Sequence, residues 1–196
     1  MNLFWYSSVM KPINTLLALL FISLLSSPSW SVTIDDLVER NGLYYKKFTD
    51  VPFSAKVTGG SRQGSFKNGK KEGAWVRYWE NGQLKDKNNF KNGKREGTSV
   101  AYHDDGQLNE KGNYKDDKKE GAWIHYWKNG QLGLKGNFKN GKEDGVFIAY
   151  HRDGQLRGKG NLKNGKQEGA TVVYNKDGTV NKEGTGTYKD GEKISD

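Results

Sequence analysis

The stretch Glu72–Arg95, EGAWVRYWENGQLKDKNNFKNGKR, returns along the chain at a fixed interval. Its first glycine recurs at Gly73, Gly97, Gly121, Gly145 and Gly169. A tyrosine keeps the same interval at Tyr78, Tyr102, Tyr126, Tyr150 and Tyr174, as does a second glycine at Gly82, Gly106, Gly130, Gly154 and Gly178. A fixed period of this length is the signature of a repeat architecture, so the fold must be derived from the unit.

Each unit contains two turn signals. The first is Glu80-Asn81-Gly82 and the second is Lys91-Asn92-Gly93, with counterparts in later units. Asn or Asp followed by Gly between short strands is typical of a hairpin, because Gly accepts a positive φ. Asp116-Asp117 departs from this pattern. Connections this short require antiparallel neighbours. We therefore predict an all-β fold, an elongated single antiparallel β-meander that grows by one hairpin per 24-residue repeat.

Strand alternation predicts two faces. A three-residue first loop with Gly82 in the left-handed region would place Leu84 beside Tyr78. We expect Val76, Tyr78, Leu84 and Phe90 to share one face with the glycines Gly112, Gly136, Gly160 and Gly184. The opposite face is expected to be basic, with Lys85, Lys87 and Lys91, and to carry the tryptophans of the repeats.

Residues 1–31 have the features of a secretory signal peptide. A basic Lys11 precedes an apolar run over 16–25, and small residues stand at Ser29 and Ser31. The run is too short to span a bilayer comfortably. The chain has no cysteine, which excludes disulfides, thiolate catalysis and a lipid-acceptor cysteine. We expect an exported protein of the bacterial periplasm or exterior; an uncleaved N-terminal anchor is the alternative, and both Met1 and Met10 are candidate starts.

Residues 32–52 are predicted to form an N-terminal capping segment. Thr33 as a helix cap and an apolar stripe at Ile34, Leu37 and Val38 predict a short helix over 32–41. Strands are expected over 43–47 and 53–57. The repeat domain is predicted over 53–196, with units near 73–96, 97–120, 121–144, 145–168 and 169–193 after a degenerate first copy.

No catalytic, cofactor or metal site is predicted. The segment Gly136–Glu143 is similar to a phosphate loop but lacks the Ser or Thr for the metal and lies in a hairpin. His103 and His151 are four strands apart, at roughly 19 Å for the usual strand spacing, too far to share a metal. The acidic residues are spread by the repeat instead of converging in pairs. The sequence therefore predicts a protein that is not an enzyme.

Two strands carry the candidate partner-binding residues. These are Trp75, Arg77 and Trp79 in one unit and Trp123, His125 and Trp127 two units later. Exposed aromatic rings beside cations would form a binding platform. The same rings could instead pack across strands and hold the twist of a thin sheet. Both interpretations stay open at this point.

These residues resemble the MORN repeat, and more closely its bacterial variant found in YwqK-type proteins. The resemblance rests on GAWVRYWENGQL and GAWIHYWKNGQL, followed by GNFKNGKEDG and GNLKNGKQEG, and covers about 53–193. Ser99, Phe147 and Thr171 depart from the Trp of the pattern, and Asn88 from its Gly. The resemblance implies a ladder of β-hairpins that binds proteins or lipids without catalysis. Some bacterial relatives carry an antitoxin label.

The formal net charge of +9 favours anionic partners, although lysines in turns also keep a thin sheet soluble. We expect an exported scaffold that binds a protein or a cell-envelope component. A carbohydrate- or anionic-lipid-binding module acting through a Trp/Lys face is one alternative, and an antitoxin- or immunity-like protein is another. Self-association through sheet edges is a further expectation. Export makes nucleic acid the least expected partner.

Overall fold

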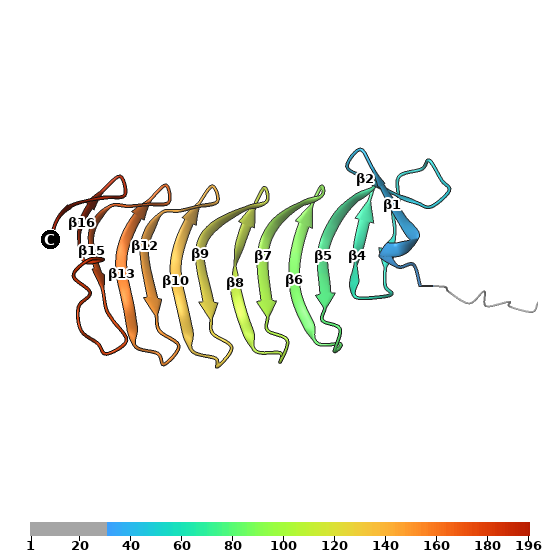
Figure 1. Ribbon diagram of the computed structural model, residues 1–196. Coiled ribbons are helices and arrows are strands. Elements are labelled where there is room, and N and C mark those ends of the chain that lie inside the picture. The colour runs from blue at the N-terminus through green and yellow to red at the C-terminus, as the bar shows by residue number, and fades with distance from the viewer. Residues whose placement is uncertain (1–30) are drawn as a thin grey trace, which may run out of the picture. The chain divides into compact units, whose positions relative to one another are not determined.

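An antiparallel sheet of 15 strands follows the chain in order from one edge to the other (Figure 1). The computed structural model describes residues 31–196, so the predicted signal peptide falls almost entirely outside the described residues. The strands of the first half of the sheet are β3 (Lys56–Val57), β4 (Arg62–Lys67), β5 (Lys70–Tyr78), β6 (Leu84–Lys91), β7 (Lys94–Tyr102) and β8 (Leu108–Lys115). Those of its second half are β9 (Lys118–Tyr126), β10 (Leu132–Lys139), β11 (Lys142–Glu143), β12 (Gly145–Tyr150), β13 (Leu156–Lys163), β14 (Lys166–Gln167), β15 (Gly169–Val173), β16 (Gly186–Lys189) and β17 (Glu192–Ser195).

Both predicted turns are confirmed. In the first, Trp79 N donates to Gln83 O at 2.8 Å around a three-residue loop, and Gly82 has a φ of +82°. The second has two central residues with positive φ, Asn92 at 52° and Gly93 at 87°. Both turns recur in every unit, so each hairpin lies beside the next (Figure 1) and the meander follows from turn chemistry alone.

The predicted faces are wrong beyond Leu84, because a β-bulge changes the alternation. Tyr78 pairs with Leu84 as expected, but Arg77 pairs with Asp86, so Lys85 is an extra residue. Every later residue of β6 then changes side. Phe90 therefore lies on the side of Trp75, while Lys87 pairs with Val76 on the other side. Equivalent bulges recur in β8, β10 and β13.

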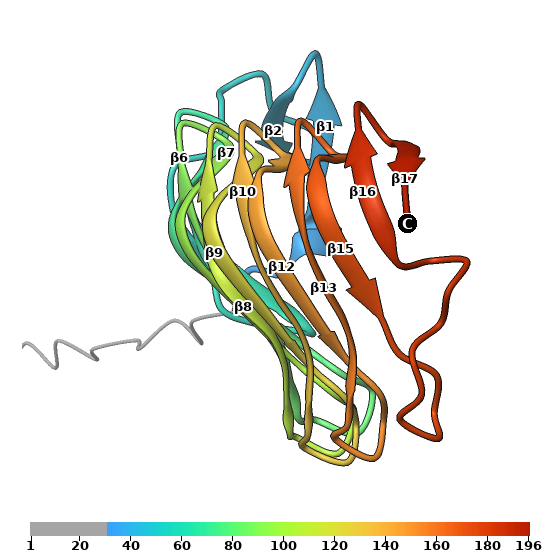
Figure 2. The ribbon, with the colours of Figure 1, turned by 90° about the vertical axis from the view of Figure 1, so that its left-hand side faces the viewer.

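The bulges define two faces that differ from those predicted. The tryptophan face carries a middle row at the Trp75 position of each unit: Trp75, Ser99, Trp123, Phe147 and Thr171. The lysine face carries Lys87, Lys111, Lys135 and Lys159, each paired with a Val or Ile of a neighbouring strand. Figure 2 shows that the strands of the sheet are curved along their length. The predicted Trp/Lys face is thus two opposite faces. Of the lysines predicted there in β6, only Lys85 lies over a tryptophan, 4.0 Å from the ring centre of Trp79.

The short helix predicted over 32–41 is present only at its start, where Thr33 is the N-cap residue as predicted. Only Ile34–Asp36 is helical, as a single 3-10 turn (η1), before β1 (Leu37–Arg40) and β2 (Leu43–Lys46) form a hairpin. The turn between β1 and β2 is Asn41-Gly42, with φ values of 52° and 75°, the same signal as in the repeats. Asp36 accepts hydrogen bonds from Thr33 N and Oγ1, and these bonds lower the pKa of the Asp36 carboxyl.

The N-terminal segment covers the tryptophan face at the β4–β5 end. Leu37 and Val57 are buried with Phe66 and Trp75 in one cluster. The partly buried side chains packed against this cluster are Val32, Ile34, Tyr44, Phe53 and Phe90. A single sheet cannot bury both of its faces, so covering one with an adjoining segment removes apolar surface from water.

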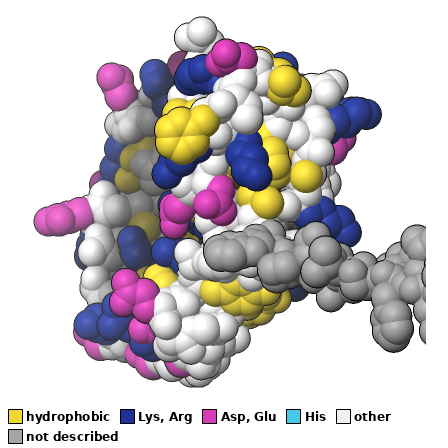
Figure 3. Space-filling view, turned by 90° about the vertical axis from the view of Figure 1, so that its right-hand side faces the viewer, with side chains coloured by type: hydrophobic (Ala, Val, Ile, Leu, Met, Phe, Trp, Pro, Cys, Tyr) yellow, Lys and Arg dark blue, Asp and Glu magenta, His cyan; other side chains and the backbone are white. Residues whose placement is uncertain are grey.

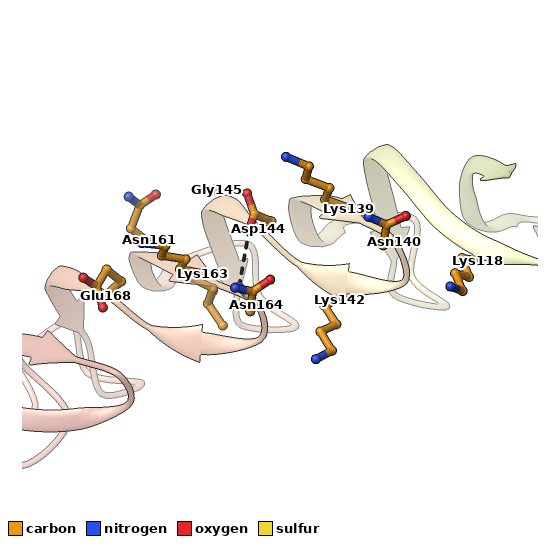
Figure 4. A pocket seen from close by; sticks show the side chains of 11 residues that line it. Lys118, Lys139, Asn140, Lys142, Asp144, Gly145, Asn161, Lys163, Asn164 and Glu168 are labelled. Atoms are coloured by element: carbon orange, nitrogen blue, oxygen red, sulfur yellow. Dashed lines mark hydrogen bonds between the residues drawn. The ribbon is translucent and has the colours of Figure 1, made fainter.

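The acidic residue before each unit-opening position has a structural role. Glu120 Oε2 accepts a hydrogen bond from the Asn140 backbone N at 2.9 Å, which ties the turn that follows β10 to β9. Glu72, Glu96 and Glu168 make the equivalent bond, and Asp144 makes it to Asn164 N at 3.4 Å, the dashed line in Figure 4. These carboxylates are engaged in holding successive turns together.

Glu120→Ala is expected to lower the free energy of unfolding by about 1 kcal/mol, because one hydrogen bond to a charged acceptor is lost. Denaturant unfolding of the purified protein measures it. The matched control is Glu80→Ala, since Glu80 is exposed and its side chain forms no hydrogen bond within residues 31–196. Equal losses in the two variants would contradict a specific role for Glu120.

Candidate binding surfaces

Trp75 and Trp123 are core residues. Their exposed fractions are 3% and 2%, and each ring lies over a glycine of the preceding strand, Gly64 and Gly112. A Cβ added at Gly112 would lie 2.2 Å from Trp123 Cδ2. The glycines predicted to share a face with Tyr78 thus lie on the tryptophan face instead, where a large ring covers Gly112. Of the two interpretations of these tryptophans, cross-strand packing describes Trp75 and Trp123, whose rings are not accessible to a partner.

Trp79 and Trp127 lie half-buried beside the first turns and connect neighbouring hairpins. Trp79 Nε1 donates to Tyr102 O at 3.3 Å, and Trp127 Nε1 donates to Tyr150 O at 3.2 Å. His103 and His151 occupy the same position in the alternate units, with Nε2 at 3.0 and 3.1 Å from the carbonyls of Tyr126 and Tyr174. The alternation of Trp and His thus preserves a ring nitrogen that bonds to the next unit.

Arg77 and His125 occupy the same position in different electrostatic surroundings. Arg77 Nε lies 3.0 and 2.8 Å from the two carboxylate oxygens of Asp86, which is buried. His125 pairs with Leu134, which stands where the unit of Arg77 has Asp86. Partial burial lowers the pKa of His125, opposed by the Glu110 carboxylate. The structure does not bring the six predicted binding residues together into one surface.

An apolar groove of about 380 Å³ lies on the tryptophan face over β10–β15. The side chains that line it come only from those strands, and they include Leu134, Phe147, Ala149, Leu162 and Val173. Thr171 takes the tryptophan position here, and its buried Oγ1 has no hydrogen-bond partner within the described residues. The groove could not be predicted from strand alternation, because the bulges in β10 and β13 move Leu134 and Leu162 to the tryptophan face.

Two other surfaces stand out. The tips of the second turns form an open groove lined by Lys118, Lys139, Lys142 and Lys163 together with Asp144 and Glu168 (Figure 4). At the N-terminal end, hydrophobic side chains are interspersed with charged ones (Figure 3). Val38, Phe48 and Val51 of this end are exposed. The first surface carries mixed charge, and the second is discontinuous.

Within residues 31–196, no group of three or more His, Cys, Asp or Glu side chains could hold a metal ion, and no helix has the length and apolar character to cross a bilayer.

The stacked hairpins, the repeated turns and the buried tryptophans define a β-hairpin repeat protein. A family model described as "MORN repeat variant" matches residues 71–92, 95–116, 119–140 and 143–164, each window covering one hairpin of the sheet. The chain is a MORN-repeat protein, and MORN repeats are commonly protein- or membrane-binding modules. No curated protein matches the chain.

Proposed function

We propose that this MORN-repeat protein is an exported, non-enzymatic binding module whose tryptophan face docks a protein of the cell envelope. The observation that carries the proposal is the apolar groove over β10–β15. The signal-like sequence of residues 1–31 supports export. The repeated carboxylates of Glu72, Glu96 and Glu120 accept hydrogen bonds from backbone N–H groups of the turns. This structural role supports a function without catalysis.

The opposite end of the same face indicates what kind of partner fits. Over β4 and β5, apolar side chains of residues 32–57 pack on Phe66 and Trp75. The groove over β10–β15 offers Phe147 at the repeat position of Trp75 and Leu162 at that of Phe66, and Leu134 lines it as well. A partner segment with alternating apolar side chains would remove this surface from water as the N-terminal segment does at the other end.

Leu134→Asp is expected to abolish capture of the envelope partner. A carboxylate in the wall of the groove would have to be desolvated on docking, which costs more than the apolar contact gains. The fold should tolerate it, because Asp86 occupies the equivalent position two units earlier. The measurement is a pull-down from an envelope extract with the wild-type protein, identification by mass spectrometry, and titration of the purified partner against both forms.

Val146→Asp is the matched control. Val146 is 51% exposed and pairs with Asn161 on the lysine face, opposite the groove. It should bind the partner with unchanged affinity. Equal binding of the partner by Leu134→Asp, or equal loss in Val146→Asp, would count against the groove as the docking surface.

A glycan is the second candidate ligand, favoured by the surroundings of Trp127. An open groove there is lined by Trp127, His103, His125 and Arg152, and Arg152 lies 5.3 Å from the ring centre of Trp127. A ring with an adjacent cation is a suitable platform for a polar ligand. Peptidoglycan or polysaccharide sedimentation would separate the candidates, since a glycan-binding protein would be retained and Trp127→Ala would release it.

The remaining alternatives have less support. Anionic-lipid binding would have to use the lysine face without Trp75 and Trp123, because these lie on the other side. Self-association through edge strand β17 is disfavoured by its charged residues Glu192 and Lys193. An antitoxin role rests on the label of some bacterial relatives alone.

A further inference from the structure

A second cavity lies at the other end of the tryptophan face, between β4 and β7. Its volume is about 240 Å³, and Trp75 forms part of its wall. Four cationic side chains from β4, β5 and β7 line it, namely Arg62, Lys71, Arg77 and Arg95, with Asp86 as the sole lining carboxylate. The pairing of successive strands brings these residues, which are far apart in the sequence, to one place.

The positive charge in this cavity is incompletely balanced. Arg77 forms its ion pair with Asp86 at 2.6 Å, and Arg95 pairs with Asp117 at 3.2 Å while lying over the ring of Tyr114. Arg62 and Lys71 form no ion pair within residues 31–196. Lys71 instead lies between two rings, 4.8 Å from the ring centre of Trp75 and 5.1 Å from that of Phe90.

The ionisation of Lys71 reflects the excess charge. Burial lowers the pKa of Lys71, and Arg62 and Arg77 lower it further, while Glu39 and Asp86 oppose them. The two nearby carboxylates therefore do not offset burial and the two arginines, so the charged form of Lys71 remains disfavoured. An anion bound in the cavity would favour the charged form of Lys71 and raise its pKa.

The repeat itself supplies a comparison. At the equivalent positions two units later, around Trp123, the charges are different: Glu110 replaces Arg62, Leu134 replaces Asp86 and Glu143 replaces Arg95. Lys119, the counterpart of Lys71, forms an ion pair with Glu110. Packing of the tryptophan thus does not require the three arginines around Trp75, since Trp123 is equally buried with Glu110, His125 and Glu143 in their places.

We propose that the cavity at Trp75 binds an oxyanion group, a phosphate or a carboxylate, through Arg62 and Lys71. Guanidinium and ammonium groups form charge-assisted hydrogen bonds with both groups, and these bonds are stronger in a partly desolvated site. This site is separate from the groove over β10–β15, so it stands or fails independently of the docking proposal.

Isothermal titration of the full chain with inorganic phosphate and, separately, with citrate tests the proposal at low ionic strength. Saturable binding of at least one anion with a single site per chain is expected, and the anion that binds identifies the group. Arg62→Gln and Lys71→Gln should each weaken binding by about tenfold or more, the loss of one charge-assisted hydrogen bond.

Lys119→Gln is the matched control, because it alters the equivalent lysine beside Trp123, and it should leave the affinity unchanged. Arg62 is exposed, so Arg62→Gln decides the matter if Lys71→Gln does not fold. Absence of saturable binding for both anions, or an equal loss in Lys119→Gln, would overturn the proposal.

Discussion

Trp123→Ala is expected to lower the free energy of unfolding by about 3–5 kcal/mol, the range for removing a fully buried large aromatic side chain. The ring packs edge-on against Tyr114 and Phe138, with centroid distances of 5.1 and 6.2 Å. Lys119 Nζ lies 3.9 Å from its centre, and its Nε1 donates to Asn113 O at 3.1 Å. All of these contacts join β8, β9 and β10.

The measurement combines denaturant unfolding with amide hydrogen exchange. Repeat proteins open locally because each unit contacts mainly its neighbours, so protection should fall first in β8–β10. Trp127→Ala is the matched control, because Trp127 is only half-buried, and a smaller loss is expected. A Trp123→Ala protein of unchanged stability would contradict the core role and restore a binding-platform interpretation.

Gly112→Ala is expected to lower the free energy of unfolding by about 3 kcal/mol, the upper part of the usual range for overpacking. The added methyl group would lie 2.2 Å from Trp123 Cδ2 and 2.3 Å from Cε2, so the ring must leave its place. Gly112 lies in an extended strand opposite Ser99, so the backbone itself would accept alanine. The cost is therefore steric.

A double-mutant cycle isolates that steric cost. In the Trp123→Ala background, Gly112→Ala should be neutral or slightly stabilising, giving a coupling of about 3 kcal/mol between the two sites. Gly121→Ala serves as the control: its φ is +70° and nothing lies within 4 Å of the added Cβ. Its cost, about 1–2 kcal/mol from the left-handed backbone, should be independent of Trp123. Additive effects of Gly112→Ala and Trp123→Ala would refute the proposed contact.

Local signals in the sequence predicted most of the architecture. The Asn-Gly and Asp-Gly turns at a fixed interval were sufficient for strand number, order and direction, because two- and three-residue loops allow only antiparallel neighbours. The helix prediction over 32–41 rests on an apolar stripe of helical spacing and fails beyond Asp36, where Asn41-Gly42 is a turn of the same kind as in the repeats. Pairing of Leu37–Arg40 with Leu43–Lys46 and packing of Leu37 on the sheet outweighed a short and weak helical pattern.

The candidate site was less predictable than the fold. One bulge residue, Lys85 in β6, reverses the side of every following residue, and the sequence contains no signal for a bulge at that place. This reversal separates the tryptophans from the lysine rows and assembles the groove at Leu134 and the cavity at Lys71. A comparison of alternate units shows that the units around Trp75 carry more cations. It does not show that these side chains line one cavity.

By itself, the sequence of Glu72–Arg95 and its copies determined a non-globular ladder of hairpins, because turn geometry acts between adjacent residues and needs no distant contact. Only the tertiary structure decided which residues share a face. That decision depends on the bulge and on the fit of each large ring over a glycine of the neighbouring strand. Trp75 and Trp123, prominent in the sequence as exposed candidates, are therefore the buried centres of the sheet, and the surfaces left for ligands lie beside them.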